Sequence, residues 1–263
     1  MSVARSGLIE GMSALARSTR CSGSVPAMLR SGVALGAAVA VAGWAAPALL
    51  RGRVLRAAIC PALAGLGRAG HVALTFDDGP DPEGTPAVLD VLDRLGWTAT
   101  FFMLGTQVQR YPQVAAAVVS AGHEAAVHGF SHRNHLARDP VDVHRDVARA
   151  TSVVSAATGT RPSWFRPPYG VLTAGSLTAA RRAGLRPVLW TAWGRDWELR
   201  NPAQIASTIK AQLRSGGTVL LHDSDCTARA AASWRATVQT LPRLAELADG
   251  LGCSVGPLRE HFA

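Results

Sequence analysis

Cysteine is scarce in this chain of 263 residues, and its cysteines lack the spacing of a structural zinc site. The four are Cys21, Cys60, Cys226 and Cys253. A zinc ribbon needs closely spaced cysteine pairs, which this sequence does not contain. Cys226 and Cys253 could pair only outside the cytosol. The interpretation we favour is four unpaired thiols.

Acidic residues are nearly absent from the first 70 positions, where Glu10 is the only one among eight arginines. The rest of the chain is close to neutral, although the whole carries a net charge of +9. A nucleic-acid-binding domain carries its basic face on the fold itself. The charge distribution therefore argues against nucleic acid as a partner. The 48% hydrophobic content excludes a disordered chain.

One uncharged stretch, residues 31–50, is flanked by Arg30 and Arg51. Its length is close to the minimum that spans a bilayer, but it is rich in alanine and glycine and contains Pro47. Three interpretations stay open: an uncleaved membrane anchor, a long signal peptide, or a helix packed on the domain. We expect an extracytoplasmic protein, either anchored in the membrane or secreted, with membrane contact through residues 31–50.

From His71 onward, short apolar runs alternate with helical stretches. The predicted strands are residues 71–77, 98–104, 124–128, 164–167, 187–193, 217–222 and 253–258. The predicted helices lie near residues 85–95, 111–121, 140–157, 173–183, 202–214 and 232–248. This alternation is typical of parallel strands joined by crossover helices. We therefore expect an α/β fold, a distorted (β/α)7-type barrel preceded by a hydrophobic helical segment, with an open doubly wound sheet as the alternative.

The predicted domains are residues 1–68, a basic and hydrophobic N-terminal segment with a linker, and residues 69–263, a catalytic domain. Polar residues collect where the strands of the second domain end. In parallel barrels the carboxyl ends of the strands carry the active site. The residues concerned are Asp77, Asp78, His128, Arg166, Asp196, His222 and Asp223.

Asp77 and Asp78 stand in the motif TFDDGPDP at the end of the first predicted strand. Adjacent carboxylates diverge, so one can bind a metal while the other faces a substrate. The competing interpretation is an acidic turn, because Asp, Gly and Pro all favour turns.

His128 and His132 are four residues apart in HGFSHRNH. On a helical turn this spacing places both imidazoles on one side, where they can chelate one ion. With a carboxylate they leave positions open for water, as a catalytic zinc-type site requires. His135 is a further candidate ligand. The competing interpretation is surface histidines in a polar loop.

His222 ends an apolar run, where a lone histidine is more often a satisfied core residue. Across the barrel mouth from a metal it could instead donate a proton to a leaving amine. Asp196 or Asp223 could hold its ring. Arg166 could pair with a carboxylate, or be a surface arginine before a turn.

Five ordered motifs together resemble the polysaccharide deacetylase family, carbohydrate esterase family four, also called the NodB-homology domain. They are TFDDGP, HGFSH at 128–132, RPPYG at 166–170, RDW at 195–197 and LLH at 220–222. The resemblance covers residues 71–258. Two positions depart from the family pattern: Gly129 replaces the usual Ser or Thr, and Trp193 stands where the fourth motif often begins with Asp.

The resemblance implies a role for each matching residue. Asp77 is the expected general base, oriented by Arg166, and His222 is the expected general acid, tuned by Asp196. The implied ligands of a divalent ion are Asp78, His128 and His132. The ion is expected to be zinc, with cobalt, nickel or manganese as alternatives. The backbone amide of Tyr169 is expected at the oxyanion, and Trp197 and Leu220 around the acetyl methyl group.

The resemblance also implies the reaction, which is hydrolysis of N-acetyl groups on a peptidoglycan or chitin-like glycan. O-deacetylation is the second choice within this class. The alternative class is a non-catalytic glycan-binding protein on the same fold. Against it, a binding module has no need of a base and an acid around a metal. We expect the protein to be a monomer.

Overall fold

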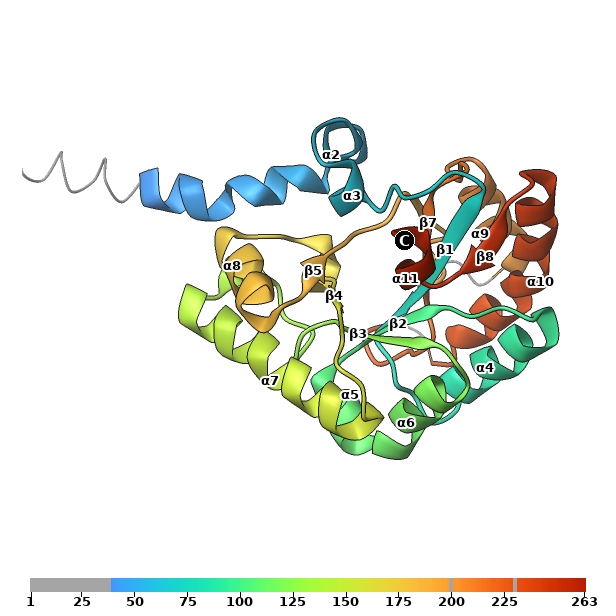
Figure 1. Cartoon of the computed structure of the whole chain (residues 1–263), viewed down its shortest axis with the longest axis horizontal. Helices are drawn as coiled ribbons and strands as arrows, with labels where there is room; N and C mark the ends of the chain where they lie inside the picture. Colours follow the sequence, from blue (N-terminus) through green and yellow to red (C-terminus); the bar gives the residue numbers. More distant parts are fainter. Residues whose placement is uncertain (1–38, 199–200, 229–230) are drawn as a thin grey trace, which may run out of the picture. The chain divides into compact units, whose positions relative to one another are not determined.

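The computed structural model describes residues 39–198, 201–228 and 231–263, and its centre is a curled sheet of parallel strands (Figure 1). Hydrogen-bonded neighbours follow the order β5-β4-β3-β2-β1-β7-β6, and β8 pairs with β1. The strands are β1 His71–Asp77, β2 Thr100–Met103, β3 Glu124–Val127, β4 Trp164–Phe165, β5 Arg186–Pro187, β6 Ala192–Trp193, β7 Thr218–His222 and β8 Ser254–Gly256.

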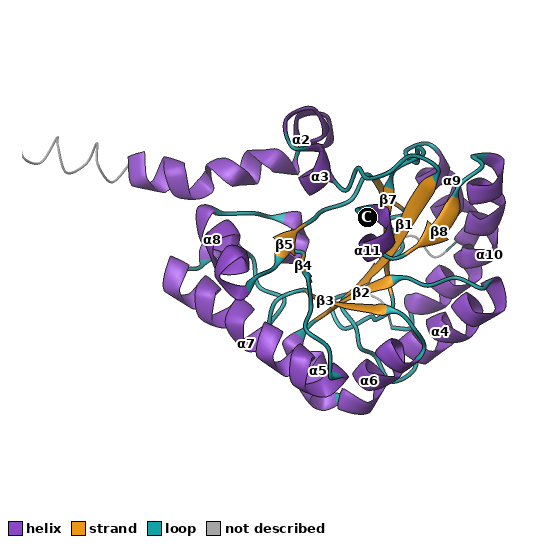
Figure 2. Cartoon of the chain, viewed as in Figure 1, coloured by secondary structure: helices purple, strands orange, loops and turns teal. Residues whose placement is uncertain are grey.

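Helices surround this sheet on the outside (Figure 2). They are α4 Gly84–Leu95, α5 Gly105–Arg110, α6 Pro112–Ser120, α7 Pro140–Thr158, α8 Ala174–Ala183, α9 Pro202–Lys210, α10 Trp234–Gly250 and α11 Leu258–His261. Single turns of 3-10 helix, η2 His135–Ala137 and η3 Pro168–Gly170, lie in the loops after β3 and β4. The strands and crossover helices confirm the predicted distorted (β/α)7 barrel.

Local sequence explains where the longest of these helices begins and ends. The Asp139 side chain accepts the backbone N–H groups of Val141 and Asp142, which caps the start of α7. Pro140 occupies the first helical position, where its missing N–H costs nothing. Gly159 ends the helix with a φ of 66°, a left-handed conformation that glycine adopts without strain.

The main core lies between the sheet and its outer helices. β1 is buried along its whole length. Phe76 stacks against Phe101 of β2, with ring centroids 4.9 Å apart. Leu92 of α4 and Leu241 of α10 pack on the same cluster. Burial on both faces explains why β1 is largely apolar until it reaches Asp77.

The segment predicted as one strand, residues 187–193, forms two short strands. β5 pairs with β4 at one end of the sheet, and β6 pairs with β7 at the other. Residues 188–191 therefore connect β5 and β6, the two ends of the curled sheet. At this break the backbone N–H of Leu189 donates to the carbonyl of Leu63 at 2.8 Å.

Residues 46–64 precede the sheet and belong to the same compact unit as the barrel, which runs from Val41 to Ala263. They form η1 Ala46–Arg51, α2 Arg53–Ile59 and α3 Pro61–Ala64. The predicted apolar stretch of residues 31–50 falls partly outside the described residues, which begin at 39. Within the described ranges, no helix has the length and apolar character needed to cross a membrane.

Three of the four cysteines lie in the described part of the chain. Cys60, Cys226 and Cys253 are free thiols, so the alternative of a Cys226–Cys253 disulfide is not realised. Cys21 lies outside the described residues.

Candidate active site

The predicted site residues converge at the carboxyl ends of the strands. Asp77 ends β1 and His222 ends β7, and these two residues are register partners on adjacent strands. His128 and Arg166 directly follow β3 and β4. A cavity of about 300 Å³ opens between these strand ends. Its lining includes Asp77, Asp78, His128, His132, Tyr169, Trp197, Leu220 and His222.

Asp78, His128 and His132 form a cluster that can hold a metal ion, with their ligand atoms all within 4.8 Å of one another. Asp78 Oδ1 lies 3.4 Å from His128 Nε2 and 3.5 Å from His132 Nε2. This oxygen is buried and has no hydrogen-bond partner among the described residues. A buried carboxylate oxygen without a donor, facing two imidazole nitrogens, suits a divalent cation such as zinc.

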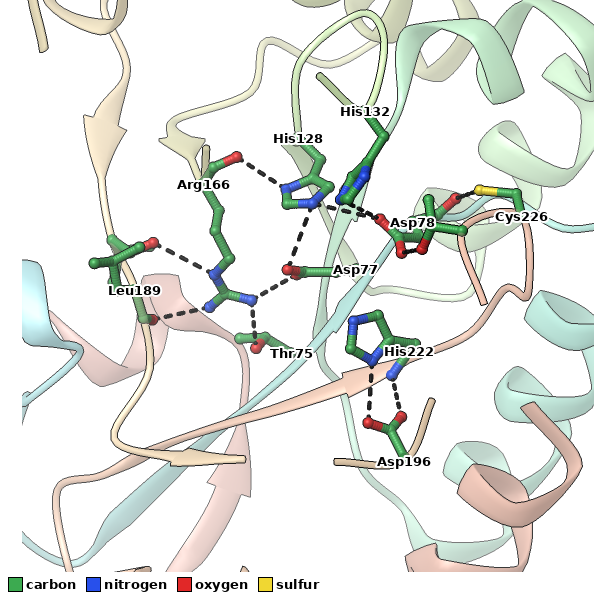
Figure 3. Close-up of polar contacts among 12 residues, drawn as sticks. Thr75, Asp77, Asp78, His128, His132, Arg166, Leu189, Asp196, His222 and Cys226 are labelled. Atoms are coloured by element: carbon green, nitrogen blue, oxygen red, sulfur yellow. Dashed lines mark hydrogen bonds and ion pairs between the residues drawn. The ribbon is translucent and has the colours of Figure 1, made fainter. Parts of the chain in front are cut away.

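Two further contacts orient this cluster. His128 Nδ1 donates to the backbone carbonyl of Arg166 at 2.9 Å (Figure 3). Because a carbonyl only accepts, Nδ1 carries a proton, and Nε2 is the ring nitrogen that faces the cluster. The Thr227 hydroxyl donates to the other oxygen of Asp78, Oδ2. These contacts thus hold two of the three candidate ligands, His128 and Asp78, in place.

Electrostatics in the cluster favour a charged Asp78 carboxylate and a neutral His132 imidazole. Burial alone would raise the pKa of the Asp78 carboxyl, but the adjacent His128 ring and the charges of the neighbouring histidines lower it overall. Burial lowers the pKa of His132 to about 4, against the opposing charge of Asp78. Metal binding requires these same protonation states.

Asp77 is held by Arg166, which is fully buried. Arg166 Nη1 donates to Asp77 Oδ1 at 2.6 Å and to the Thr75 hydroxyl at 2.9 Å. Its Nη2 donates to the carbonyl of Leu189 at 3.0 Å. The pair leaves Asp77 Oδ2 directed toward the metal cluster, 3.7 Å from His128 Nε2. Arg166 is therefore not a surface arginine.

On the other side of the cavity, His222 is paired with Asp196 (Figure 3). The ring Nδ1 of His222 lies 3.0 Å from Asp196 Oδ1, and its backbone N–H donates to Asp196 Oδ2 at 2.6 Å. Burial alone would lower the pKa of His222, but the charge and hydrogen bond of Asp196 raise it to about 9. His222 is therefore protonated near neutral pH, as a general acid must be.

Aromatic side chains form much of the remaining cavity wall. Trp193 and Trp197 are stacked with ring centroids 6.0 Å apart, and both line the cavity beside Leu220 and Trp190. Tyr169 is half exposed at the rim, with its ring centroid 4.3 Å from that of His132. An aromatic and aliphatic wall beside the polar cluster suits a ligand that has both an apolar face and polar groups.

The geometry decides two alternatives that the sequence left open. His135 is buried with its Nδ1 2.9 Å from the Ser176 hydroxyl and lies outside the ligand cluster, so it is no spare ligand. Asp223 does not hold His222; it accepts the Thr85 hydroxyl at 2.5 Å. Asp196 is the carboxylate beside His222.

Gly129, a departure from the family pattern, has a φ of 94°, which favours glycine. The loop that follows it is held by Asp146 of α7. The Asp146 carboxylate accepts the backbone N–H of Phe130 at 2.7 Å and the Ser131 hydroxyl at 3.1 Å. Arg138 also donates to this carboxylate, at 2.7 Å.

Sequence reasoning missed several residues that support the site. Thr75 had a detectable signal, because it lies two residues before Asp77 on the same strand and so faces the same side. No sequence signal marks the other three, Asp146, Thr227 and Thr237, because each contacts the site from a distant part of the chain. Thr237 of α10 donates to Asp196 Oδ2 at 2.9 Å.

Comparison with known proteins finds likenesses in both sequence and fold. The sequence model of one family, described as polysaccharide deacetylase, matches residues 65–188. The chain is 41% identical over 153 residues to the chitooligosaccharide deacetylase of Bradyrhizobium sp. (strain ANU 289), covering 58% of this chain and 70% of that protein.

Two further likenesses are more distant. The peptidoglycan-N-acetylglucosamine deacetylase PgdA of Listeria monocytogenes is 33% identical over 153 residues, which cover 58% of this chain and 32% of that protein. The solved structure of the family 4 carbohydrate esterase from Streptomyces lividans, in complex with acetate, is 29% identical with a TM-score of 0.64. That match covers 71% of this chain and 92% of the solved one.

Proposed function

The chain belongs to the polysaccharide deacetylase family, and we propose that it is a metal-dependent hydrolase that removes N-acetyl groups from a glycan. The observation that carries the proposal is the arrangement of one cavity. A cluster of three metal-ligand side chains lies beside a carboxylate that is held by an arginine. A histidine paired with its own carboxylate lines the same cavity.

The ion that we propose is zinc, held by Asp78, His128 and His132, with cobalt, nickel or manganese as substitutes; a ligand set of one carboxylate and two imidazoles supports it. A divalent ion bound there would act as a Lewis acid toward water and the acetyl carbonyl.

Two side chains of the protein carry out the two proton transfers of the proposed reaction. Asp77, oriented by Arg166, accepts a proton from the attacking water. His222 donates its proton to the sugar nitrogen as the carbon–nitrogen bond breaks. Asp196 stabilises the charged form of His222 before that transfer. The backbone N–H of Tyr169 is the proposed donor to the developing oxyanion.

The proposed substrate is an N-acetylated amino-sugar polymer of the chitin or peptidoglycan type. The names of the relatives from Bradyrhizobium and Listeria support this class. The apolar wall formed by Trp193, Trp197 and Leu220 fits the methyl group and the sugar face. O-acetylated polysaccharide is the second choice.

A substrate screen tests this proposal. Metal-loaded protein is incubated with N-acetylglucosamine oligomers, peptidoglycan and O-acetylated xylan, and released acetate is measured. We expect release from the N-acetylated glycans that a chelator abolishes. Binding to these glycans without acetate release from any of them would instead support a non-catalytic glycan-binding protein.

We also propose that the protein acts outside the cytoplasm, with residues 31–50 as its anchor or signal. The polymeric substrate and the uncharged sequence of this stretch support the proposal. Cell fractionation with N-terminal sequencing of the recovered protein tests it. A full-length chain confined to the cytoplasmic fraction would contradict it.

A further inference from the structure

One residue that lines the catalytic cavity comes from the segment before the family match. Arg56 belongs to α2, whereas the family match begins at residue 65. The other described residues that line this cavity lie at Asp77 or later in the chain. Arg56 is only 2% exposed, so it is part of the wall and not a surface charge.

The contacts of Arg56 lead to Trp190, another residue of the cavity wall. Arg56 Nη2 donates to the backbone carbonyl of Trp190 at 2.6 Å, a charge-assisted hydrogen bond. Its guanidinium carbon lies 5.9 Å from the centroid of the Trp190 ring, which places the cation near that ring as well. Arg56 thus holds both the backbone and the ring of Trp190.

Trp190 needs such support because it stands in the break between β5 and β6. Residues 188–191 belong to neither strand, and part of their support comes from the segment before the sheet. Besides the bond between Leu189 and Leu63, the Thr218 hydroxyl of β7 donates to the carbonyl of Gly65 at 2.7 Å. Through Leu63, the segment before the family match therefore supports the chain at this interruption.

The same break also supports the catalytic carboxylate. Arg166 donates to the carbonyls of Val188 and Leu189, which immediately precede Trp190. The Arg166 guanidinium carbon lies 5.6 Å from the Trp190 ring centroid. The ring is thus in reach of two guanidinium groups, Arg56 from the N-terminal segment and Arg166 from the family motif.

We propose that Arg56 is a positioning residue for substrate binding: it fixes Trp190 as a wall on which the acetylated sugar rests. This inference rests on the proposed deacetylase function. It assigns to the helices α2 and α3 a part in the active site, so the catalytic unit begins before the region that the family defines.

Three variants of the full, metal-loaded chain test the proposal. Arg56→Met removes the donors and the charge, and Arg56→Lys keeps a cation that can still reach one carbonyl. Arg68→Met is the matched control, because Arg68 is exposed, lies outside the cavity and donates to the carbonyl of Glu260 at 2.7 Å. The substrate is an N-acetylglucosamine oligomer, and kcat and KM are measured separately.

We expect Arg56→Met to raise KM about tenfold while kcat changes little, since a wall contact made equally in the ground and transition states is lost. Arg56→Lys should recover part of the loss, and Arg68→Met should match the parent. A parental KM in Arg56→Met would overturn the proposal. So would a loss confined to kcat, because Arg56 would then act on the chemical step.

Hydrogen exchange separates this proposal from the proposed function. If the parent chain releases no acetate, the function fails, but the backbone amide of Leu189 still reports on the break. We expect faster exchange of residues 186–193 in Arg56→Met than in Arg68→Met. Equal exchange in the two variants would overturn the positioning role whatever the activity.

Discussion

The backbone carbonyl of Arg166 accepts the ring N–H of His128 at 2.9 Å, while the Arg166 guanidinium donates to Asp77 at 2.6 Å. One residue therefore orients a proposed metal ligand through its backbone and the proposed base through its side chain. This relationship couples the position of the His128 ring to that of the Asp77 carboxylate. Arg166 is fully buried, and burial lowers the pKa of its guanidinium, while the charge and the hydrogen bond of Asp77 oppose that shift.

The pH above which activity is lost should depend on the charge of Asp196. Activity is present while His222 is protonated and is lost as the pH rises through its pKa, which the Asp196 charge raises. Asp196→Asn removes that charge, so the alkaline limb of the pH–kcat profile should move down by about one to three units. Thr237→Val removes only a neutral hydrogen bond to Asp196 and should leave the limb in place. Identical limbs for Asp196→Asn and the parent would contradict the role of Asp196.

Metal affinity should depend on His128 and not on His135. His128→Ala removes one of three ligands, so affinity should fall by more than about a hundredfold, beyond what the loss of a supporting hydrogen bond costs. His135→Asn changes a buried histidine outside the cluster and should bind metal like the parent. Isothermal titration with zinc measures both. A parental affinity in His128→Ala would remove it from the ligand set.

Asp146 should matter for metal binding without touching the metal. Asp146→Asn places an amide nitrogen where the carboxylate accepts donors from Phe130, Ser131 and Arg138. The loop between the two histidine ligands should loosen, and zinc affinity should fall by about ten- to a hundredfold. Asp142→Asn, on the same helix but half exposed, is the control. Equal affinities for the two variants would show that the loop does not depend on Asp146.

Buried histidines should make the fold sensitive to acid. Burial lowers the pKa of His71 and of His261 to about 4, and their Nδ1 atoms lie 2.9 Å apart. Their neutral forms stabilise the fold fully above the unfolded pKa of about 6.5. As the pH falls from there toward 4, the unfolded chain binds more protons and stability is lost.

Urea unfolding at a series of pH values measures this loss. Each histidine should contribute a slope of up to about 1.4 kcal/mol per pH unit in that window. His261→Asn should make the slope shallower. A free energy of unfolding that stays constant between pH 6.5 and 4 would contradict the prediction.

Much of the fold was predictable because local patterns determine it. β1 runs from His71 to Asp77 as expected, since an apolar run ends there at two carboxylates followed by Gly79 and Pro80. The break in residues 187–193 could not be predicted. Its sequence is a largely apolar run without a turn signal. It forms two strands because its first part pairs with β4 and its last part pairs with β7. Helix α5 was missed because its short sequence, GTQVQR, lacks an apolar period.

The part of the site that could be predicted consists of residues at the carboxyl ends of strands. Asp77, His128, Arg166 and His222 could be placed from topology alone, because parallel strand ends share one edge. Site residues that come from helices could not be placed in this way. Asp146 and Arg56 reach the site through contacts whose partners are far away in sequence, and no local pattern marks them.

Acetate release in the presence and absence of metal tests the central claim most directly. The parent chain and Asp77→Asn are each loaded with zinc, incubated with an N-acetylglucosamine oligomer, and then treated with a chelator. The parent should release acetate only with metal, and Asp77→Asn should keep its metal but lose at least about a hundredfold in kcat. Full activity in Asp77→Asn, or release that survives complete removal of metal, would contradict the account.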